Sequence, residues 1–539
     1  MDNAFLAERL EALAALLDLS GSSYYTVRAY RRAAELIRST PADVPALVRA
    51  GRARELAGIG PAIEARLREL VETGELAELR ELEAEALPEL VGVGRLLGLS
   101  PKRMRELGHA LGVRTLDELR AAVEAGRLQE ARGVGPKTAA RIRQGLEEAT
   151  TARPRRGMLL NRARALVTEL AEGVGGVPAG DPRRWCDLST RFAVVVPNGA
   201  LDRLERLPQV VAVLERDERR AVVVTAEGYP VEFVVAAPER LGTELLRATG
   251  SPGYVAALGP LPEAPTEEDV YSALGLSYRP PELREPGAPE APADLVRLDD
   301  VRGDLHVHST ASDGKASVRE MAEAALERGY EYLAICDHTQ AVRVVPGLDA
   351  DGLRRQAEEV AAVNAAVEPF RVLRGTECDV LPDGSLDLPD DVLAELDWVQ
   401  VSLHAGQRWG REALTARVVE ALQRAAALRP GRVCLSHPKG RILNHRPENA
   451  LDLDRVFEVA LGAGIALEVN GLPDRLDLSA EHARRALEAG VKLVCSTDAH
   501  SVRGLGNMAL SVATARRAGA RSDEVLNTRR LGDLVSTRH

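Results

Sequence analysis

The chain has 539 residues, of which 45% are hydrophobic and 28% are charged, which is typical of a globular protein with several domains. No stretch of about 18 apolar residues occurs and the N-terminus lacks the basic start of a signal peptide, so we expect neither a membrane span nor secretion. The net charge of −11 excludes a uniformly basic nucleic-acid-binding surface. The five cysteines lie far apart in the chain, which predicts reduced thiols and a cytoplasmic location.

The first 150 residues predict short amphipathic helices. Leu6, Leu10, Leu13 and Leu17 follow helical spacing, and turn signals recur every 10 to 15 residues. Three similar glycine-containing phrases interrupt this region, each before a helical pattern. They occupy residues 57–62, 98–103 and 132–138, and the third lies in a stretch, 127–164, with ten Lys and Arg against three Glu.

These phrases are similar to helix-hairpin-helix hairpins, which bind nucleic-acid backbones without reading sequence. Glycine lets the backbone approach a phosphate closely, and the N–H groups at the next helix start can donate to it. One such phrase is more often a simple tight turn, but two or three within a helical region, the copy at 98–103 having Ser in place of the second glycine, predict DNA binding. The expected DNA-binding residues are Gly58, Gly60, Gly98, Lys102, Gly133, Gly135, Lys137 and Arg141.

From residue 160 to residue 278 the pattern changes to short apolar runs with intervening helical stretches. Runs such as 192–196, 221–224 and 231–235 predict strands in an α+β domain. The following segment, 279–296, contains five prolines and predicts a linker.

After residue 302 predicted strands alternate with predicted helices, which indicates a parallel sheet or barrel with ligands at the C-terminal strand ends. Eight of the ten histidines lie between residues 300 and 500, most of them at those ends. His306 and His308 are two residues apart, so a strand would place both imidazoles on one face. Imidazoles and carboxylates together indicate a metallohydrolase. The expected strands are 332–336, 371–376, 398–403, 432–436, 465–470 and 491–496.

The hairpins and the histidine motifs are joined by three further phrases, at residues 24–34, 249–251 and 278–285. Together they resemble the bacterial and archaeal X-family DNA polymerases with a C-terminal PHP (polymerase and histidinol phosphatase) domain. The resemblance implies a multidomain fold: an α-helical helix-hairpin-helix N-terminal region, an α+β palm and thumb, and a distorted (β/α) barrel of the PHP type. The implied domains are a helical 8-kDa-like domain with the first hairpin (1–95), a fingers-like helix-hairpin-helix domain (96–155), a degenerate palm and thumb (156–278), a Pro-rich linker (279–300) and the PHP metallohydrolase domain (301–539).

The PHP resemblance implies three divalent metal ions. Mn²⁺ is the ion that the family favours, while mixed His and carboxylate ligands also suit Zn²⁺ or Fe²⁺. Arg441 is expected to bind a substrate phosphate as part of the catalytic set, with a structural ion pair as the alternative, and Asp337 either orients an imidazole or is an ordinary loop residue. The implied metal sets are His306, His308, Glu377 and Asp498; Glu377, His404 and His437; and Asp313, His338 and His500.

The palm departs from the family pattern. Nucleotide transfer needs carboxylates that hold two metals, but Arg191 and Ala193 stand at the paired aspartate positions, and Glu232 at the third. Asp181 replaces the serine of the usual Gly-Ser pair. We therefore expect an inactive palm, unless a shifted alignment makes Asp187 a displaced ligand. Residues 1–101 contain no lysine, which argues against Schiff-base lyase chemistry.

The hypothesis from sequence is a monomeric DNA-repair phosphoesterase. We expect a 3′→5′ exonuclease, with AP-endonuclease or 3′-end processing activity, acting on gapped, nicked or 3′-ended DNA without sequence preference. Three alternatives stay open: a bifunctional gap-filling polymerase with a PHP nuclease, a PHP phosphatase of small molecules, and a DNA-binding scaffold without activity.

Overall fold

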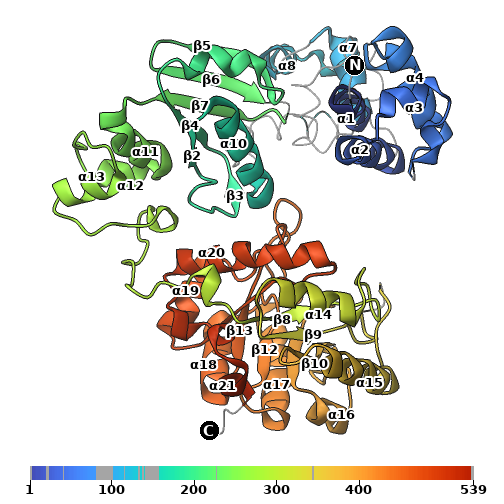
Figure 1. Cartoon of the computed structure of the whole chain (residues 1–539), viewed down its shortest axis with the longest axis vertical. Coiled ribbons are helices and arrows are strands. Elements are labelled where there is room, and N and C mark those ends of the chain that lie inside the picture. The colour runs from blue at the N-terminus through green and yellow to red at the C-terminus, as the bar shows by residue number, and fades with distance from the viewer. Residues whose placement is uncertain are drawn as a thin grey trace. The chain divides into compact units, whose positions relative to one another are not determined.

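The computed structural model describes residues 3–19, 24–40, 42–56, 58–80, 101–113, 116–131, 157–225, 227–342 and 345–535, together with the single positions 134, 135, 139 and 142. The chain divides into two compact units, residues 1–155 and 156–539 (Figure 1). Within the described ranges, no helix is both long and apolar enough to cross a membrane.

The first unit is helical where it is described. Its first core is built by the leucine stripe of α1, with Leu6, Leu10 and Leu13 fully buried against Ile37 of α2 and Leu67 of α4. A second core lies between the later helices α7 and α8. The bounds are α1 (Asn3–Leu19), α2 (Tyr24–Ser39), α3 (Val44–Arg49), α4 (Pro61–Thr73), α7 (Pro101–Leu111) and α8 (Leu116–Glu124).

The second unit begins with a five-stranded mixed sheet of order β2-β4-β7-β6-β5, in which only β4 and β7 run parallel. The inner strand β4, between β2 and β7, is apolar throughout because both of its faces are covered. Phe192 and Val194 pack in the cluster of α10, whereas Ala193 and Val195 pack in the cluster of α11. The bounds are α10 (Leu160–Val174), β2 (Val177–Gly180), β4 (Phe192–Val196), β5 (Val210–Arg216), β6 (Arg220–Thr225), β7 (Pro230–Val235) and α11 (Leu241–Thr249).

Two shorter helices, α12 (Pro252–Ala257) and α13 (Glu267–Ala273), follow α11, and the Pro-rich segment then packs against its surroundings. Arg284 in this segment is fully buried and pairs with Glu267. Glu282 accepts a hydrogen bond from Arg516 of α20 at 2.8 Å. The segment therefore lies fixed between the two parts of the second unit rather than as a free tether.

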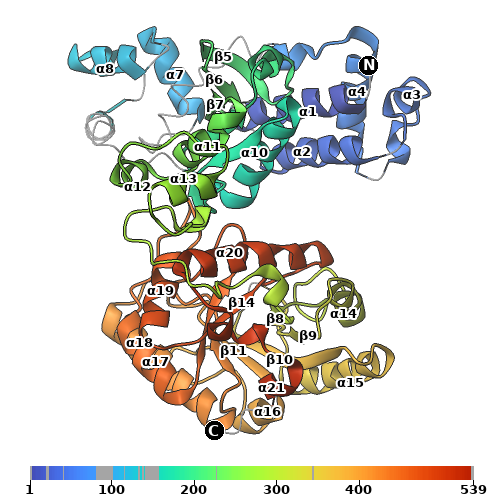
Figure 2. The ribbon, with the colours of Figure 1, turned by 60° about the vertical axis from the view of Figure 1, so that its left-hand side comes forward.

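The C-terminal domain is a parallel sheet of seven strands in sequential order, β8 to β14, surrounded by helices (Figure 2). The edge strands nearly close the sheet, because Val307 forms a bridge with Ala499 and His308 N donates to Ala499 O at 2.9 Å. The strands are β8 (Gly303–Val307), β9 (Tyr332–Ile335), β10 (Arg371–Asp379), β11 (Trp398–Ser402), β12 (Val433–Leu435), β13 (Ala466–Asn470) and β14 (Leu493–Ser496).

Alternating side chains divide the core of this domain into two layers. Leu333 and Ile335 of β9 face the cluster formed with the outer helices, while Tyr332 and Ala334 join a smaller cluster that contains Trp398. The outer helices are α14 (Val318–Glu327), α15 (Ala350–Ala366), α16 (Asp390–Glu395), α17 (Arg411–Leu428), α18 (Leu453–Ala463), α19 (Ala480–Glu488) and α20 (Met508–Ala518), and α21 (Leu531–Val535) follows near the C-terminus. The fold class expected from the sequence is confirmed, including the alternation of strands and helices.

Candidate metal centre and palm site

A cluster of histidines and carboxylates lies at the C-terminal ends of the PHP-type strands. Each strand from β8 to β12, and β14, contributes at least one side chain, either from its last residues or from the following loop. This is the edge where parallel barrels place their functional groups. The nine clustered residues are His306, His308, Asp313, His338, Glu377, His404, His437, Asp498 and His500.

Glu377 lies at the middle of the cluster, and its side chain is 1% exposed. Its Oε1 is 2.8 Å from His437 Nε2 and 3.5 Å from His404 Nε2. Its Oε2 is 2.9 Å from His338 Nδ1 and 3.5 Å from His306 Nε2. One carboxylate therefore faces imidazoles from four different strand ends, an arrangement suited to bridging metal ions.

Two further carboxylates complete the cluster. Asp498 Oδ1 is 3.0 Å from His308 Nε2 and 3.8 Å from His306 Nε2. Asp313 Oδ2 is 3.2 Å from His500 Nε2, and its Oδ1 is 3.6 Å from His338 Nε2. Three overlapping groups therefore bring their ligand atoms within 4.8 Å of one another: His308, Asp313, His338 and His500; His306, His308 and Glu377; and His338, Glu377 and His404.

Four buried polar atoms in the cluster make no hydrogen bond within the described part of the chain: His306 Nε2, His308 Nδ1, His338 Nδ1 and Glu377 Oε2. His338 Nδ1 and Glu377 Oε2 lie 2.9 Å apart, but as an ion-pair contact without the geometry of a hydrogen bond. Buried polar atoms in folded proteins nearly always have a hydrogen-bonding partner, so four such atoms in one place need an explanation. A divalent cation accepts electron pairs from imidazole nitrogen and carboxylate oxygen, and it fits this donor set. The residues present are therefore suited to hold metal ions.

The carboxylates of the cluster are held in their charged form. Burial acts to raise the pKa of Glu377, but His338, His404 and His306 hold this pKa well below its usual value. Burial acts in the same direction on Asp313, whose pKa is lowered to about 2 by its hydrogen bond with His500 and by the surrounding histidines. Both side chains are thus anionic at neutral pH, the state that binds cations.

Two carboxylates behind the cluster were not identified from the sequence. Glu468 of β13 is fully buried, and its Oε1 lies 2.6 Å from His306 Nδ1. This contact orients the ring so that Nε2 faces the cluster. Asp379 Oδ1 accepts a hydrogen bond from His404 N at 3.0 Å. Each side chain interrupts or ends an apolar strand, and that was the signal available in the sequence.

Among the residues that the structure describes, no imidazole shares a hydrogen bond with the carboxylate of Asp337. Its carboxylate accepts hydrogen bonds from Ser309 N, Ser309 Oγ, Ser312 Oγ and Gln356 Nε2. The carboxylate therefore holds the loop that follows His308.

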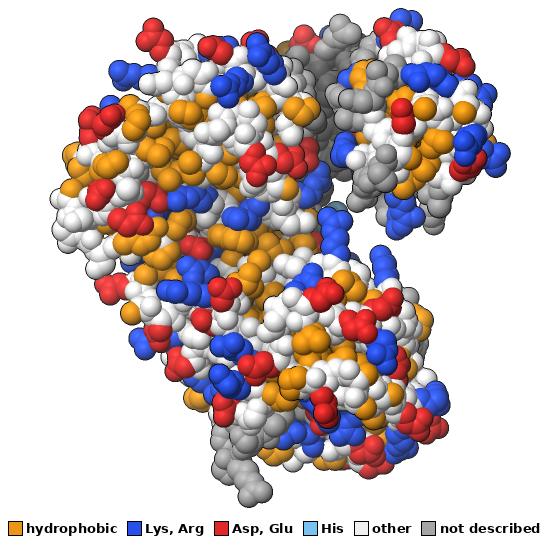
Figure 3. Space-filling view, in the orientation of Figure 1, with side chains coloured by type: hydrophobic (Ala, Val, Ile, Leu, Met, Phe, Trp, Pro, Cys, Tyr) orange, Lys and Arg blue, Asp and Glu red, His pale blue; other side chains and the backbone are white. Residues whose placement is uncertain are grey.

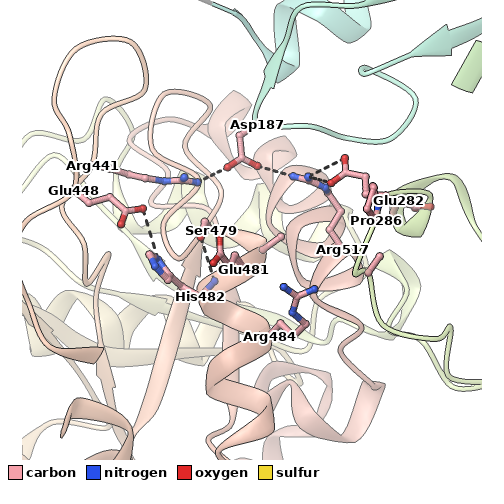
Figure 4. Close-up of a pocket in the computed structure, with 13 residues that line it drawn as sticks. Asp187, Glu282, Pro286, Arg441, Glu448, Ser479, Glu481, His482, Arg484 and Arg517 are labelled. Atoms are coloured by element: carbon pink, nitrogen blue, oxygen red, sulfur yellow. Dashed lines mark hydrogen bonds and ion pairs between the residues drawn. The ribbon is translucent and has the colours of Figure 1, made fainter. Parts of the chain in front are cut away.

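Arg441 lies at the contact between the PHP-type domain and the middle sheet. Its Nη2 donates to Asp187 Oδ2 at 2.6 Å and to the Leu476 carbonyl, and its Nε donates to the Arg475 carbonyl at 2.9 Å. The ion pair that the sequence left open is thus present, while contact with a substrate phosphate stays a prediction. A cavity of about 500 Å³ opens beside this pair, and none of the nine clustered residues lines it (Figure 4).

The positions expected to hold metals in a palm have other partners. Arg191 donates to Gly250 O at 3.2 Å, and Ala193 is buried on β4 in register with Glu232 of β7. Glu232 pairs with Arg220. Asp181 is buried and accepts hydrogen bonds from Thr190 N, Arg191 N and Arg184. Among the described residues 157–225 and 227–278, no group of three or more metal-binding side chains comes together.

The first hairpin has the backbone that its glycines predict. Gly58 has a φ of +107°, which side chains disfavour, and Gly60 precedes α4 as its N-cap residue with Pro61 at the first helical position. Gly135 has open space where a Cβ would stand. Gly98, Gly133, Lys137 and Arg141 lie outside the described residues, as does the side chain of Lys102.

Three family models match the chain: a helix-hairpin-helix domain over residues 1–76, a SAM-like helix-hairpin-helix tandem over 95–148, and the PHP domain over 304–470. Over 562 aligned positions, covering 97% of both chains, the sequence is 34% identical to a protein of Bacillus subtilis (strain 168) named DNA polymerase/3'-5' exonuclease PolX. The chain belongs to the PolX family. It has the N-terminal helix-hairpin-helix domains and the C-terminal PHP domain of that family.

Other relatives match only part of this PolX-family chain. A protein of Acetivibrio thermocellus named as a probable phosphatase is 30% identical over 206 residues, 36% of this chain and 78% of that protein. A similarly named protein of Thermoanaerobacter sp. is 27% identical over 239 residues, 42% of this chain and 89% of that protein.

Proposed function

We propose that this PolX-family chain is a metal-dependent phosphodiesterase that removes nucleotides from the 3′ ends of DNA at its PHP centre. The observation that carries the proposal is the cluster of nine ligands with four buried, unpartnered ligand atoms. The name of the Bacillus relative, DNA polymerase/3'-5' exonuclease PolX, supports the same function. The proposal extends to cleavage at abasic sites and to the trimming of blocked 3′ ends.

The proposed metal sets are those expected from the sequence. His306, His308, Glu377 and Asp498 would hold one ion; Glu377, His404 and His437 a second; and Asp313, His338 and His500 a third, with Mn²⁺ the preferred ion and Zn²⁺ or Fe²⁺ the other candidates. Such ions, when bound, lower the pKa of water and neutralise charge on phosphoryl oxygens.

The chain's own residues prepare the site for that chemistry. Glu468 holds His306 with Nε2 toward the cluster. His437 and Asp498 adopt φ values of +26° and +52°, in a region that residues other than glycine seldom occupy. Strain of this kind persists where the surrounding structure positions a functional side chain. The ligands are therefore held in place before a substrate arrives.

DNA is the proposed partner, bound without sequence preference by the helix-hairpin-helix domains. On the face drawn in Figure 3, basic and acidic side chains of the PHP domain are intermingled rather than sorted by sign. Local contacts by the hairpins, with N–H groups directed at phosphates, therefore suit this acidic chain better than a broad basic surface does. Gapped, nicked and 3′-ended DNA are the proposed substrates, and a monomer the proposed state.

Two candidates remain for the palm. Arg191, Ala193 and the pairing of Glu232 with Arg220 support a palm that has lost nucleotide transfer and serves to hold DNA or the PHP domain. The match over the whole length of a relative named as a DNA polymerase supports the other candidate, a bifunctional gap-filling polymerase with a PHP nuclease, and the comparisons favour this one.

One experiment separates these candidates. The full chain, and a His306→Ala, His308→Ala double variant, are incubated with a 5′-labelled primer-template and Mn²⁺, with and without dNTPs. Shortening that the double variant lacks, without extension, supports the nuclease with an inactive palm. Extension by the double variant supports the bifunctional enzyme. Hydrolysis of p-nitrophenyl phosphate without any shortening of DNA would support a small-molecule phosphatase instead.

A further inference from the structure

Arg475 lies in the loop between β13 and α19, beside the metal centre. Its Nε is 4.0 Å from Asp498 Oδ2, and its side chain is 22% exposed, so the guanidinium borders both the centre and solvent. The electrostatics agree with this position. Burial acts to lower the pKa of Arg475, but the nearby carboxylates of Asp498, Glu377 and Glu468 raise it. The pKa of His437 is lowered, first by burial and then by the positive charge of Arg475.

The side-chain donors of Arg475 are unused by the described residues. Within the described part of the chain, its guanidinium makes no hydrogen bond, and the ion pair with Asp498 at 4.0 Å is its only close contact with a carboxylate. Neighbouring arginines differ. Arg441 donates to two backbone carbonyls and to Asp187, and Arg517 donates to Asp187 and Glu285. A guanidinium carries five N–H donors, so Arg475 holds a full set free beside the nine ligands.

The backbone under Arg475 is held firmly although its side chain is free. Arg441 donates to the carbonyls of both Arg475 and Leu476. Leu476 is fully buried against Leu160 and Leu510, and it has a φ of +45°. A leucine in the left-handed region is costly and persists only where the surrounding contacts enforce it. The loop therefore presents Arg475 at a defined place.

Neutralisation of Asp498 alone does not explain this arrangement. At 4.0 Å the guanidinium is too far from the carboxylate for a hydrogen bond. Once metal ions occupy the centre, the carboxylates are neutralised by them and a fixed cation would be repelled. An anion that contacts both the metals and the guanidinium removes that repulsion. A phosphate group does so and accepts two N–H donors from one guanidinium.

We propose that Arg475 is a catalytic residue that binds the non-bridging oxygens of the scissile phosphodiester of DNA at the PHP centre. This assignment rests on the proposed nuclease function, and it gives that site a phosphate-binding group outside the set of metal ligands. It also places the substrate phosphate on the side of the centre that Arg475 and Asp498 share.

The test uses the full chain with three substitutions: Arg475→Ala, Arg475→Lys, and Arg424→Ala as the matched control. Arg424 is an exposed arginine of α17 that pairs with Asp390, outside the centre. For each variant we would measure kcat and KM for Mn²⁺-dependent shortening of a 5′-labelled oligonucleotide. Mn²⁺ binding and the affinity of the Mn²⁺-loaded chain for thymidine 5′-monophosphate would be titrated separately.

Arg475→Ala is expected to lower kcat/KM by about 10²- to 10³-fold, the usual effect of removing one preorganised donor to a reacting group. The same substitution should weaken binding of the nucleotide while leaving Mn²⁺ binding intact. Arg475→Lys should recover only part of the loss, since an ammonium cannot form the two-pronged contact. Arg424→Ala should match the wild type in every measurement.

Two results would overturn the assignment. The first is an Arg475→Ala chain that hydrolyses DNA and binds the nucleotide like the wild type. The second is a loss of Mn²⁺ affinity that accounts for the loss of activity, which would make Arg475 a support of the metal ligands. If the wild type hydrolyses no DNA, the proposed nuclease fails. The affinity for thymidine 5′-monophosphate then tests Arg475 separately. Equal affinity in the wild type and in Arg475→Ala would show that Arg475 does not bind phosphate.

Discussion

Asp187 Oδ2 lies 2.6 Å from Arg441 Nη2, and the pair joins the palm to the PHP domain within the second unit (Figure 4). The other oxygen of Asp187 accepts from Arg517 Nη1 at 2.9 Å. Both members are mostly buried, with side chains 17% and 11% exposed. Because both oxygens are engaged by arginines, Asp187 links the middle sheet to the PHP domain, and its alternative role as a displaced palm ligand stays a prediction.

Replacing Asp187 by alanine should destabilise the second unit. The change leaves the cations of Arg441 and Arg517 buried without their shared partner, and breaking a buried pair in this way costs about 3 kcal/mol. Urea unfolding of the full chain measures this loss of stability, which should appear as a lower urea concentration at the midpoint of PHP-domain unfolding. Asp202→Ala is the control, since that carboxylate is 78% exposed and such pairs contribute little. Equal midpoints for the two variants would contradict the link.

Glu468→Gln should weaken metal binding without removing a ligand. The amide cannot stabilise His306 as the carboxylate does from 2.6 Å, and the loss of a partner behind a ligand lowers metal affinity by about 10- to 100-fold. Titration with Mn²⁺ measures the affinity. Glu458→Gln, on the exposed side of α18, should bind Mn²⁺ as the wild type does. An unchanged Mn²⁺ affinity in Glu468→Gln would show that Glu468 does not support metal binding through His306.

Gly58 and Gly60 should respond differently to substitution by alanine. Gly58 has a φ of +107°, so alanine there is strained and should destabilise the hairpin by about 1–3 kcal/mol and weaken DNA binding. Gly60 has an ordinary φ of −86°, and a Cβ on it meets nothing within 4 Å. Thermal unfolding and the fluorescence anisotropy of labelled DNA would compare the variants. Identical behaviour of the two would show that the turn does not need Gly58.

The cysteines should be unreactive in the folded chain. All five are buried, and burial raises the pKa of Cys186 to about 12 and that of Cys495 to about 12. At pH 8 almost no thiolate exists, and the thiolate is the reactive form. A chromogenic disulfide reagent should therefore modify none of the five in native protein and all five in denaturant. Rapid reaction of one thiol in the native chain would place that cysteine outside its buried position.

Much of the PHP domain follows directly from the sequence. Strands such as 332–336 and 465–470 are predicted because a buried parallel strand is a short apolar run, and most of the nine clustered residues lie at or just after the end of such a run. His306 and His308 share a face because side chains alternate along a strand. These features depend on neighbours in the chain, which a single sequence displays.

Other parts of the site depend on contacts between distant segments. Arg475 lies in a loop without a motif, and only the folded chain brings its guanidinium beside Asp498. Asp187 and Arg441 are 254 residues apart. The sequence therefore allowed an ion pair of Arg441 as an alternative to phosphate binding, but it could not identify Asp187 as the partner. The Pro-rich segment 279–296 predicts a linker by composition, yet Arg284 within it is buried through a contact with Glu267.

The most direct test of the nuclease centre is Mn²⁺-dependent shortening of a 5′-labelled oligonucleotide by the full chain and by its Glu377→Gln variant. Glu359→Gln, on the exposed side of α15, serves as the control. Loss of a residue that only supports a metal ligand lowers metal affinity or activity by up to about 10²-fold. Because Glu377 itself faces four imidazoles, the Glu377→Gln variant should lose at least about 10²-fold in rate. The control should degrade the DNA from its 3′ end at the wild-type rate. A Glu377→Gln chain that shortens the oligonucleotide as fast as the wild type would place the nuclease somewhere other than the PHP centre.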